Sequence, residues 1–416
     1  MRKAEYLILI NLFILVFLCL FVEVLFRIFP IVKINWVEGN EQTGFTIPAY
    51  YTENLVYPEH PDHFFSYCSN NLGFREDDDT QIRKSDSVRI VVLGDSHTDG
   101  VCWNRESYPN RLEYYLNRAG SKKTYEVINA GTGKYSPFQY LRAYQFRIKP
   151  LKPDIVIIGF YIGNDFFDMY RRDDRPSCSF DQKGQIVELP PQFYFYAKPG
   201  FKSSWRSKSY VYYLFFGSRF WKNISYKVTR AIIFYRNISS MGGASFLKVM
   251  HYFITLDRLA KIHRHATTQS LGQQVFFHYF PSKRQESFKL AKYVLQKFIE
   301  EQKEQPFRLI VVPIPTKLEI GGDRLTDILS RAKQIMSTAS DESLSAFDDS
   351  LYTDLVSLLT NLKIEYIDFR PLLREKARQR KLYYRTDFHL NPEANDIIGE
   401  KICQYLLNPK EKEAMK

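Results

Sequence analysis

From residue 88 onward the chain alternates between two hydrophobic periods, and this alternation predicts an α/β domain. Short apolar runs rich in β-branched residues are typical of buried strands, whereas apolar residues spaced three and four apart are typical of helices. The predicted strands are 88–93, 125–128, 154–160, 307–314 and 364–369. The predicted helices are 107–118, 137–148, 286–304 and 392–407. Strands interleaved with helices indicate a parallel sheet covered on both faces.

Besides the N-terminal run, three stretches lie outside this alternation. Residues 34–87 are expected to be a linker and entry segment, with a turn at 70–75 packed on the domain and a solvated acidic run at 76–79. The interval between the third and fourth strands is too long for a loop, which predicts a structured helical or irregular insertion at about 166–285. Residues 408–416 are expected to be a C-terminal tail.

The N-terminus carries a long apolar run. Residues 6–32 are mostly apolar, with polar interruptions at Asn11 and Glu23. Roughly 20 apolar residues suffice to span a bilayer, and no small-residue cleavage site of a signal peptide follows. Basic residues before the run favour a cytoplasmic N-terminus. We therefore expect residues 1–33 to be a single-pass membrane anchor, with the catalytic domain extracytoplasmic, in the periplasm of a Gram-negative bacterium.

The first predicted strand ends in a serine that is well placed for catalysis. Gly94 breaks the strand, and Asp95 and Ser96 follow it. In open α/β sheets the chemistry lies beyond the carboxyl ends of the strands, which makes Ser96 a candidate nucleophile. The alternative is that Ser96 only caps a helix.

A histidine and a carboxylate near the C-terminus could serve such a serine. Residues two apart in an extended segment point the same way, so Asp387 and His389 can face one site. Asn391 is expected to cap the next helix, with Pro392 at its first position. A base oriented by a carboxylate is what a serine nucleophile requires.

Two further turns that follow strands could donate hydrogen bonds to an oxyanion. The turn at 129–137 is rich in glycine, but Lys134 lacks the spacing of a phosphate-binding loop, so its backbone N–H groups remain available. Asn164 follows the third strand and can donate its side-chain amide. The alternative for Asn164 is a turn in which it bonds its own backbone.

These four stretches, in this order, resemble the blocks of the SGNH (GDSL-type) hydrolase family. The matching segments are Gly94-Asp95-Ser96, Asn129-Ala130-Gly131, Gly163-Asn164-Asp165 and Asp387-Phe388-His389, and Asn71-Leu72-Gly73-Phe74-Arg75 is similar to the lead-in of membrane-anchored bacterial members. The resemblance covers about residues 70–165 and 307–407. It implies a flavodoxin-like three-layer α/β/α sandwich over residues 88–407.

The resemblance also implies roles for individual residues. Ser96 is the expected nucleophile, His389 the general base and Asp387 its orienting carboxylate. The expected oxyanion donors are the backbone N–H of Ser96, that of Gly133 or Lys134, and the Asn164 side chain. In this family the aspartate usually stands three residues before the histidine, and in this chain Thr386 occupies that position. Asp387 stands two residues before His389, which is the shorter spacing that some members use.

The composition shows a basic segment and gives no indication of a metal or cofactor site. The net charge is +12, and residues 189–256 hold ten Lys and Arg side chains, many aromatic residues and no acidic one. We expect this segment to be an interfacial cap on anionic headgroups, a lid over a polyanionic or glycan substrate, or an ordinary solvated face. Nucleic acid is not an expected partner. The five cysteines are scattered, which argues against a zinc site and a dense disulfide framework, and no metal or organic cofactor is expected.

The sequence thus predicts a membrane-anchored serine esterase or deacylase that acts on an acyl ester, for example of a cell-envelope glycan or lipid. Two alternatives stay open: an O-acyltransferase on an extracytoplasmic polysaccharide, and a non-catalytic glycan-binding member of the same fold. The acyl group, the alcohol and the oligomeric state are not predicted.

Overall fold

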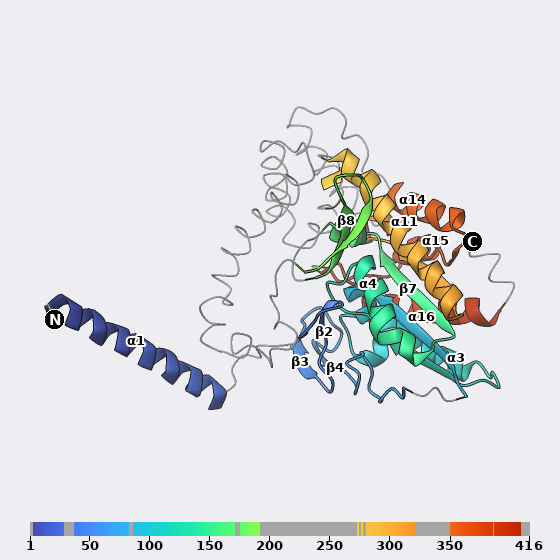
Figure 1. Cartoon of the computed structure of the whole chain (residues 1–416). Coiled ribbons are helices and arrows are strands. Elements are labelled where there is room, and N and C mark those ends of the chain that lie inside the picture. The colour runs from blue at the N-terminus through green and yellow to red at the C-terminus, as the bar shows by residue number, and fades with distance from the viewer. Residues whose placement is uncertain are drawn as a thin grey trace.

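The structure is a computed structural model of the chain (Figure 1). The residues that it describes are 3–28, 37–82, 86–170, 175–191, 273, 276–277, 280–321, 350–385 and 387–408.

A parallel five-stranded sheet forms the centre of the domain, as predicted. Its strands are β5 (Val88–Gly94), β6 (Tyr125–Asn129), β7 (Ile155–Tyr161), β10 (Arg308–Ile314) and β11 (Glu365–Tyr366). They are hydrogen-bonded in the order β11-β10-β7-β5-β6, and every neighbouring pair is parallel. Numbered along the chain, this order is 2-1-3-4-5 from the β6 edge, which is the flavodoxin-like order.

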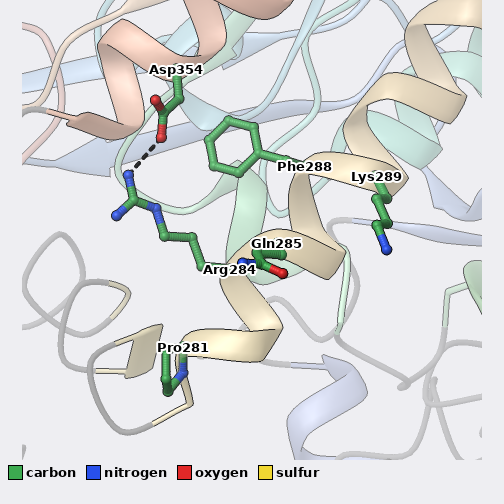
Figure 2. Close-up of a pocket in the computed structure, with 6 residues that line it drawn as sticks. All are labelled: Pro281, Arg284, Gln285, Phe288, Lys289 and Asp354. Carbon is green, nitrogen blue, oxygen red and sulfur yellow. Dashed lines mark hydrogen bonds and ion pairs between the residues drawn. The ribbon is translucent and has the colours of Figure 1, made fainter.

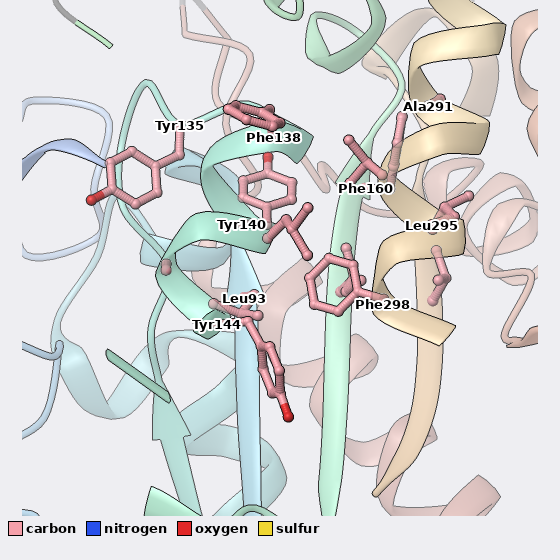
Figure 3. Packing of buried hydrophobic residues seen from close by; sticks show 14 of the residues in the cluster. Leu93, Tyr135, Phe138, Tyr140, Tyr144, Phe160, Ala291, Leu295 and Phe298 are labelled. Carbon is pink, nitrogen blue, oxygen red and sulfur yellow. The ribbon is translucent and has the colours of Figure 1, made fainter. Parts of the chain in front are cut away.

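Helices cover both faces of this sheet and make the three layers of the sandwich (Figure 1). One face packs against α3 (Tyr108–Arg118), α15 (Arg370–Ala377) and α16 (Pro392–Leu407). The other packs against α4 (Pro137–Ala143), α11 (Pro281–Glu304) and α14 (Ser350–Asn361). Figure 3 shows the second layer, in which Tyr140 of α4, Phe160 of β7 and Phe298 of α11 are buried in one cluster.

The burial of β5 on both faces explains why its sequence is a continuous apolar run. Ile90 and Val92 point into the core under α3, and Val91 and Leu93 point into the core under α4 and α11. All four are fully buried. A parallel strand covered on both faces needs apolar residues at successive positions, so its alternation is hidden in the sequence.

The remaining elements are short. Three two-stranded antiparallel pairs are β1 (Glu38–Asn40) with β2 (Gly44–Thr46), β3 (Thr52–Val56) with β4 (Phe64–Cys68), and β8 (Ser177–Phe180) with β9 (Ile186–Leu189). The short helical turns are α2 (Ser96–Asp99), Asn104–Glu106, Tyr144–Ile148, Lys149–Leu151, α5 (Asp165–Asp168) and α12 (Lys317–Ile320).

The segment before the sheet packs closely on the domain. Arg75 is 1% exposed, which confirms that 70–75 packs against the domain. The expectation that 76–79 is a solvated run is wrong for Glu76, which is buried and accepts hydrogen bonds from the Asn129 N–H and the Asn110 side chain. Burial raises the pKa of Glu76 well above its usual value, although these two bonds oppose the shift.

The predicted single-pass anchor over residues 1–33, and the membrane location that depended on it, are wrong. The run forms helix α1 (Lys3–Ile28). No helix among the residues that the structure describes combines the length and the apolar character needed to cross a membrane. The polar residues Asn11 and Glu23 interrupt the run. Most of the predicted insertion at 166–285 lies outside the described residues, including all of the basic segment 189–256 after residue 191.

Candidate active site

Ser96 lies just beyond the carboxyl end of β5, between β7 and the edge strand β6. β5 ends at Gly94, and Asp95 is the N-cap of α2, with its side chain accepting a hydrogen bond of 2.9 Å from the His97 N–H. The helix is therefore capped by Asp95, which leaves the Ser96 hydroxyl available. Ser96 is only half-buried, between neighbours that are buried on both sides.

His389 and Asp387 meet Ser96 from the other end of the chain. The Nε2 of His389 lies 2.7 Å from the Oγ of Ser96, and its Nδ1 is hydrogen-bonded to the Oδ1 of Asp387. The same Oδ1 accepts the His389 backbone N–H at 3.1 Å. The structure thus brings the three predicted residues into one hydrogen-bonded chain from serine to carboxylate.

The loop that carries His389 is held at both ends. Tyr383 and Leu390 form a β-bridge across it. Asn391 caps α16 by accepting the Ala394 N–H at 2.9 Å, with Pro392 in the first turn, as predicted. This fixes the backbone that presents His389 to Ser96.

Burial and the charge of the partner shift the pKa values of Asp387 and His389 in opposite directions. Burial alone raises the pKa of Asp387, but the hydrogen bonds from His389 and Tyr57 outweigh it and hold the pKa well below its usual value. Burial lowers the pKa of His389, and the Asp387 carboxylate outweighs this and raises it. Asp387 is therefore an anion that favours the protonated form of its histidine partner.

His97, the residue after the serine, lies beside this pair. It is 3% exposed and stacks on Tyr161, with ring centroids 3.6 Å apart, and its ring lies 4.9 Å from that of His389. Burial, and then the charge of His389, lower the pKa of His97 well below its usual value. His97 is therefore neutral near pH 7 and adds no charge beside the Ser96 hydroxyl.

The predicted oxyanion donors Gly133 and Asn164 lie near the turn that carries Ser96. A Cβ on Gly133 would lie 3.7 Å from the Cβ of Ser96, so this residue is adjacent to the serine. The same Cβ would lie 3.6 Å from the Oδ2 of Asp99, so Gly133 also faces this carboxylate. Lys134, the other candidate, has a left-handed backbone with φ 73°.

The Asn164 amide faces two carboxylates. Its Nδ2 lies 3.4 Å from the Oδ2 of Asp95 and 3.2 Å from the Oδ2 of Asp168, while its Oδ1 is buried and has no hydrogen-bond partner among the described residues. Asp95 is fully buried, and burial raises its pKa to about 6 against the opposing bonds from His97 and Asn164. The amide donor is thus oriented by buried acids rather than by its own backbone.

Two contributors to the site were not predicted from sequence. Tyr57 donates a hydrogen bond of 2.6 Å to the Oδ2 of Asp387. Asp99 is bonded by Tyr67 at 3.0 Å and paired with Arg75 at 3.5 Å. No sequence signal marks Tyr57, because its partner is 330 positions away. Arg75 ends the motif at 71–75 and Asp99 lies three residues after Ser96, but only the folded chain shows that they pair.

Among the described residues, no group of three or more His, Cys, Asp or Glu side chains is arranged to hold a metal ion. A pocket of about 600 Å³ lies between α11 and α14, where Arg284 and Asp354 pair at 2.6 Å (Figure 2). Its lining residues are Pro281, Arg284, Gln285, Phe288, Lys289 and Asp354. None of them belongs to the group around Ser96, so this pocket is separate from the site.

Comparison with known families gives a match for the C-terminal third of the chain. Residues 279–413 match the family model described as "SGNH hydrolase-like domain, acetyltransferase AlgX". A search of curated proteins returns no match. This matched stretch contains His389 and Asp387, whereas Ser96 lies outside it.

Solved structures share a distant likeness. An acetyl xylan esterase is 12% identical, with a TM-score of 0.33, over 77% of this chain and 100% of its own. An alpha/beta hydrolase from the metagenome of Lake Arreo, Spain, is 10% identical, with a TM-score of 0.36, over 80% and 98%. A catalytic mutant of an acetylxylan esterase from Geobacillus stearothermophilus is 11% identical, with a TM-score of 0.35, over 79% and 96%.

Proposed function

We propose that this chain, whose residues 279–413 match an SGNH hydrolase-like domain, is a serine esterase with Ser96 as its nucleophile. The observation that carries the proposal is the hydrogen-bonded chain from Ser96 through His389 to Asp387. A serine hydroxyl is a weak nucleophile at neutral pH, and a neutral imidazole within hydrogen-bonding distance is what activates it. At 2.7 Å, the Nε2 of His389 is within reach of the proton that it has to accept.

In the proposed reaction the Oγ of Ser96 attacks the acyl carbon of an ester while His389 takes its proton. The anion of Asp387 keeps the Nδ1 proton in place and stabilises the imidazolium. His389 then gives its proton to the departing alcohol, which leaves an acyl group on Ser96. Water attacks this acyl-enzyme, His389 again takes and returns the proton, and the acid and free serine result.

The oxyanion of the tetrahedral intermediate needs preorganised donors. We assign them to the backbone N–H of Ser96 and the side-chain amide of Asn164, with Gly133 as the third. The contact of the Asn164 amide with Asp95 is long, at 3.4 Å, so we assign this N–H to the oxyanion. Loss of one such donor typically lowers kcat by about 10²-fold or more.

The substrate class we propose is a short acyl ester of a carbohydrate. The description of the matching family model as an acetyltransferase supports an acetyl group. The same description favours a second candidate, an O-acyltransferase, in which a sugar hydroxyl replaces water in attacking the acyl-enzyme. Both reactions use the same first half, so Ser96, His389 and Asp387 keep their roles.

Turnover of acyl esters tests this proposal. The full chain should release p-nitrophenol from p-nitrophenyl acetate and acetate from acetylated oligosaccharides, and Ser96→Ala should abolish both. Ser121→Ala is the matched control, because Ser121 is exposed. Added sugar acceptors that accumulate acetylated product identify the transferase. Turnover that survives in Ser96→Ala would contradict the proposal.

A further inference from the structure

Asp387 is held by a residue from the opposite end of the sequence. One carboxylate oxygen, Oδ1, accepts the hydrogen bond from His389, and the other, Oδ2, accepts the hydroxyl of Tyr57 at 2.6 Å. Each oxygen therefore has its own partner. A carboxylate bound at both oxygens is fixed in orientation, whereas one bound only by His389 could rotate about its side-chain bonds.

The ring of Tyr57 is itself fixed. Tyr57 follows β3, and its backbone N–H donates to the His63 carbonyl at 2.8 Å, which closes the connection to β4. Its ring packs edge-on against Tyr384, with centroids 4.9 Å apart, and against Phe65 at 5.8 Å. The hydroxyl is thus delivered by a packed aromatic side chain on a closed loop.

The same loop also holds the backbone beside Asp387. A carboxylate oxygen of Glu59 accepts the Arg385 N–H. On the far side, the Nζ of Lys317 donates to the Tyr384 carbonyl at 2.9 Å, and the Tyr384 hydroxyl donates to the Val101 carbonyl at 2.7 Å. The segment that carries Asp387 and His389 is therefore clamped by contacts on several sides.

Tyr57 acts here as a neutral donor. Burial, and then the hydrogen bond to Asp387, raise its pKa, so it stays protonated across the working pH range. The other charged or titratable groups that act on the pair from neighbouring elements are Glu59, Tyr384, Asp95, Asp99 and His97.

We propose that Tyr57 is a positioning residue, which holds the Asp387 carboxylate against the Nδ1 of His389. This inference rests on the proposed function of Ser96 and names a residue that no family motif in the chain contains. Tyr57 acts through Asp387 and does not contact the reacting atoms. By this proposal the residues around β3 and β4, which the sequence suggested only as an entry segment, complete the catalytic machinery.

Tyr57→Phe separates the hydroxyl from the packing of the ring. Without Tyr57 the carboxylate loses one of its two side-chain donors, so its negative charge acts more strongly on His389, and the pKa of His389 should rise. Freer rotation of Asp387 should lower kcat by about 10-fold, with little change in KM. Tyr51→Phe is the matched control, since the Tyr51 hydroxyl also bonds a carboxylate near β3, that of Glu53, at 2.5 Å.

The test measures the His389 titration by NMR on full-length protein with ¹⁵N-labelled histidine, assigned with His389→Gln, alongside kcat/KM for p-nitrophenyl acetate. Tyr57→Phe should raise the pKa of His389 and slow turnover, and Tyr51→Phe should do neither. An unchanged His389 titration in Tyr57→Phe overturns the inference. An inactive wild type would instead refute the proposed function, and the titration would still decide the role of Tyr57.

Discussion

At the scale of single residues, His389 is the side chain that joins the two ends of the candidate site. Ser96, Asp387 and His389 could be predicted because each lies near the end of a predicted strand or the start of a predicted helix, and because Asp387 and His389 are two apart. Tyr57 could not be predicted, because its role depends on a contact with Asp387 across 330 positions. Local patterns identify side chains that can do chemistry, and only the folded chain shows what positions them.

The pH dependence of turnover tests the pairing of His389 with Asp387. His389 acts as a base only when neutral, and Asp387 raises its pKa, so kcat/KM should fall as the pH drops through a value above about 6.5. Asp387→Asn removes the charge and leaves burial, which should move this limb to lower pH and reduce kcat by about 10⁴-fold. A pH–rate profile of both proteins measures this. An acid limb at the same pH in the wild type and in Asp387→Asn would argue against the pairing of His389 with Asp387.

At the scale of elements, the sequence located the strands of the central sheet, although the last one is shorter than predicted, and it missed the antiparallel pairs and the short helical turns. The predicted strands at 88–93 and 307–314 agree with β5 and β10 to within one residue at each end. The predicted helix at 137–148 is instead α4 followed by a π-helical turn at Tyr144–Ile148. Helix α14 was not predicted, although Leu351, Leu355 and Leu359 recur at helical spacing and are all buried.

Close packing of the glycine-rich turn against α2 gives a prediction at this scale. A Cβ on Gly131 would lie 2.3 Å from the Asp99 backbone nitrogen and 2.7 Å from the Thr98 carbonyl carbon. Gly131→Ala should therefore displace α2, destabilise the fold by about 1–3 kcal/mol and slow turnover. Gly133→Ala meets its nearest neighbours at 3.6 Å and should fold normally. Urea denaturation compares the two, and equal stability would contradict this packing.

At the scale of the whole molecule, the segment before the sheet, residues 37–82, packs with the sheet around the site. Arg75 donates to the side chain of Asn104 at 3.0 Å and to the carbonyls of Gly100 and Cys102, and it pairs with Asp99. It therefore fastens residues 70–75 to the loop that follows the nucleophile. Charge and hydropathy could not predict this, because the sequence does not distinguish a buried arginine from a solvated one. The burial of Glu76, in the acidic run beside it, could not be predicted for the same reason.

Removing this arginine should cost the whole domain stability. Arg75→Met leaves Asp99 buried without its cation, together with two backbone carbonyls without their donor, so the free energy of unfolding should drop by about 3–5 kcal/mol. Arg378→Met, at an exposed position, should change it by no more than about 0.5 kcal/mol. Chemical denaturation of the two variants measures the difference. Similar values for both would mean that Arg75 does not connect the segment to the sheet.

The most direct test of the account is the site of covalent labelling by a serine-directed fluorophosphonate. We expect peptide mass spectrometry of the folded full-length protein to find the label on Ser96, and we expect labelling to be lost in Ser96→Ala and greatly slowed in His389→Gln. A label on another residue, or labelling that persists in Ser96→Ala, would contradict the claim that Ser96 is the nucleophile.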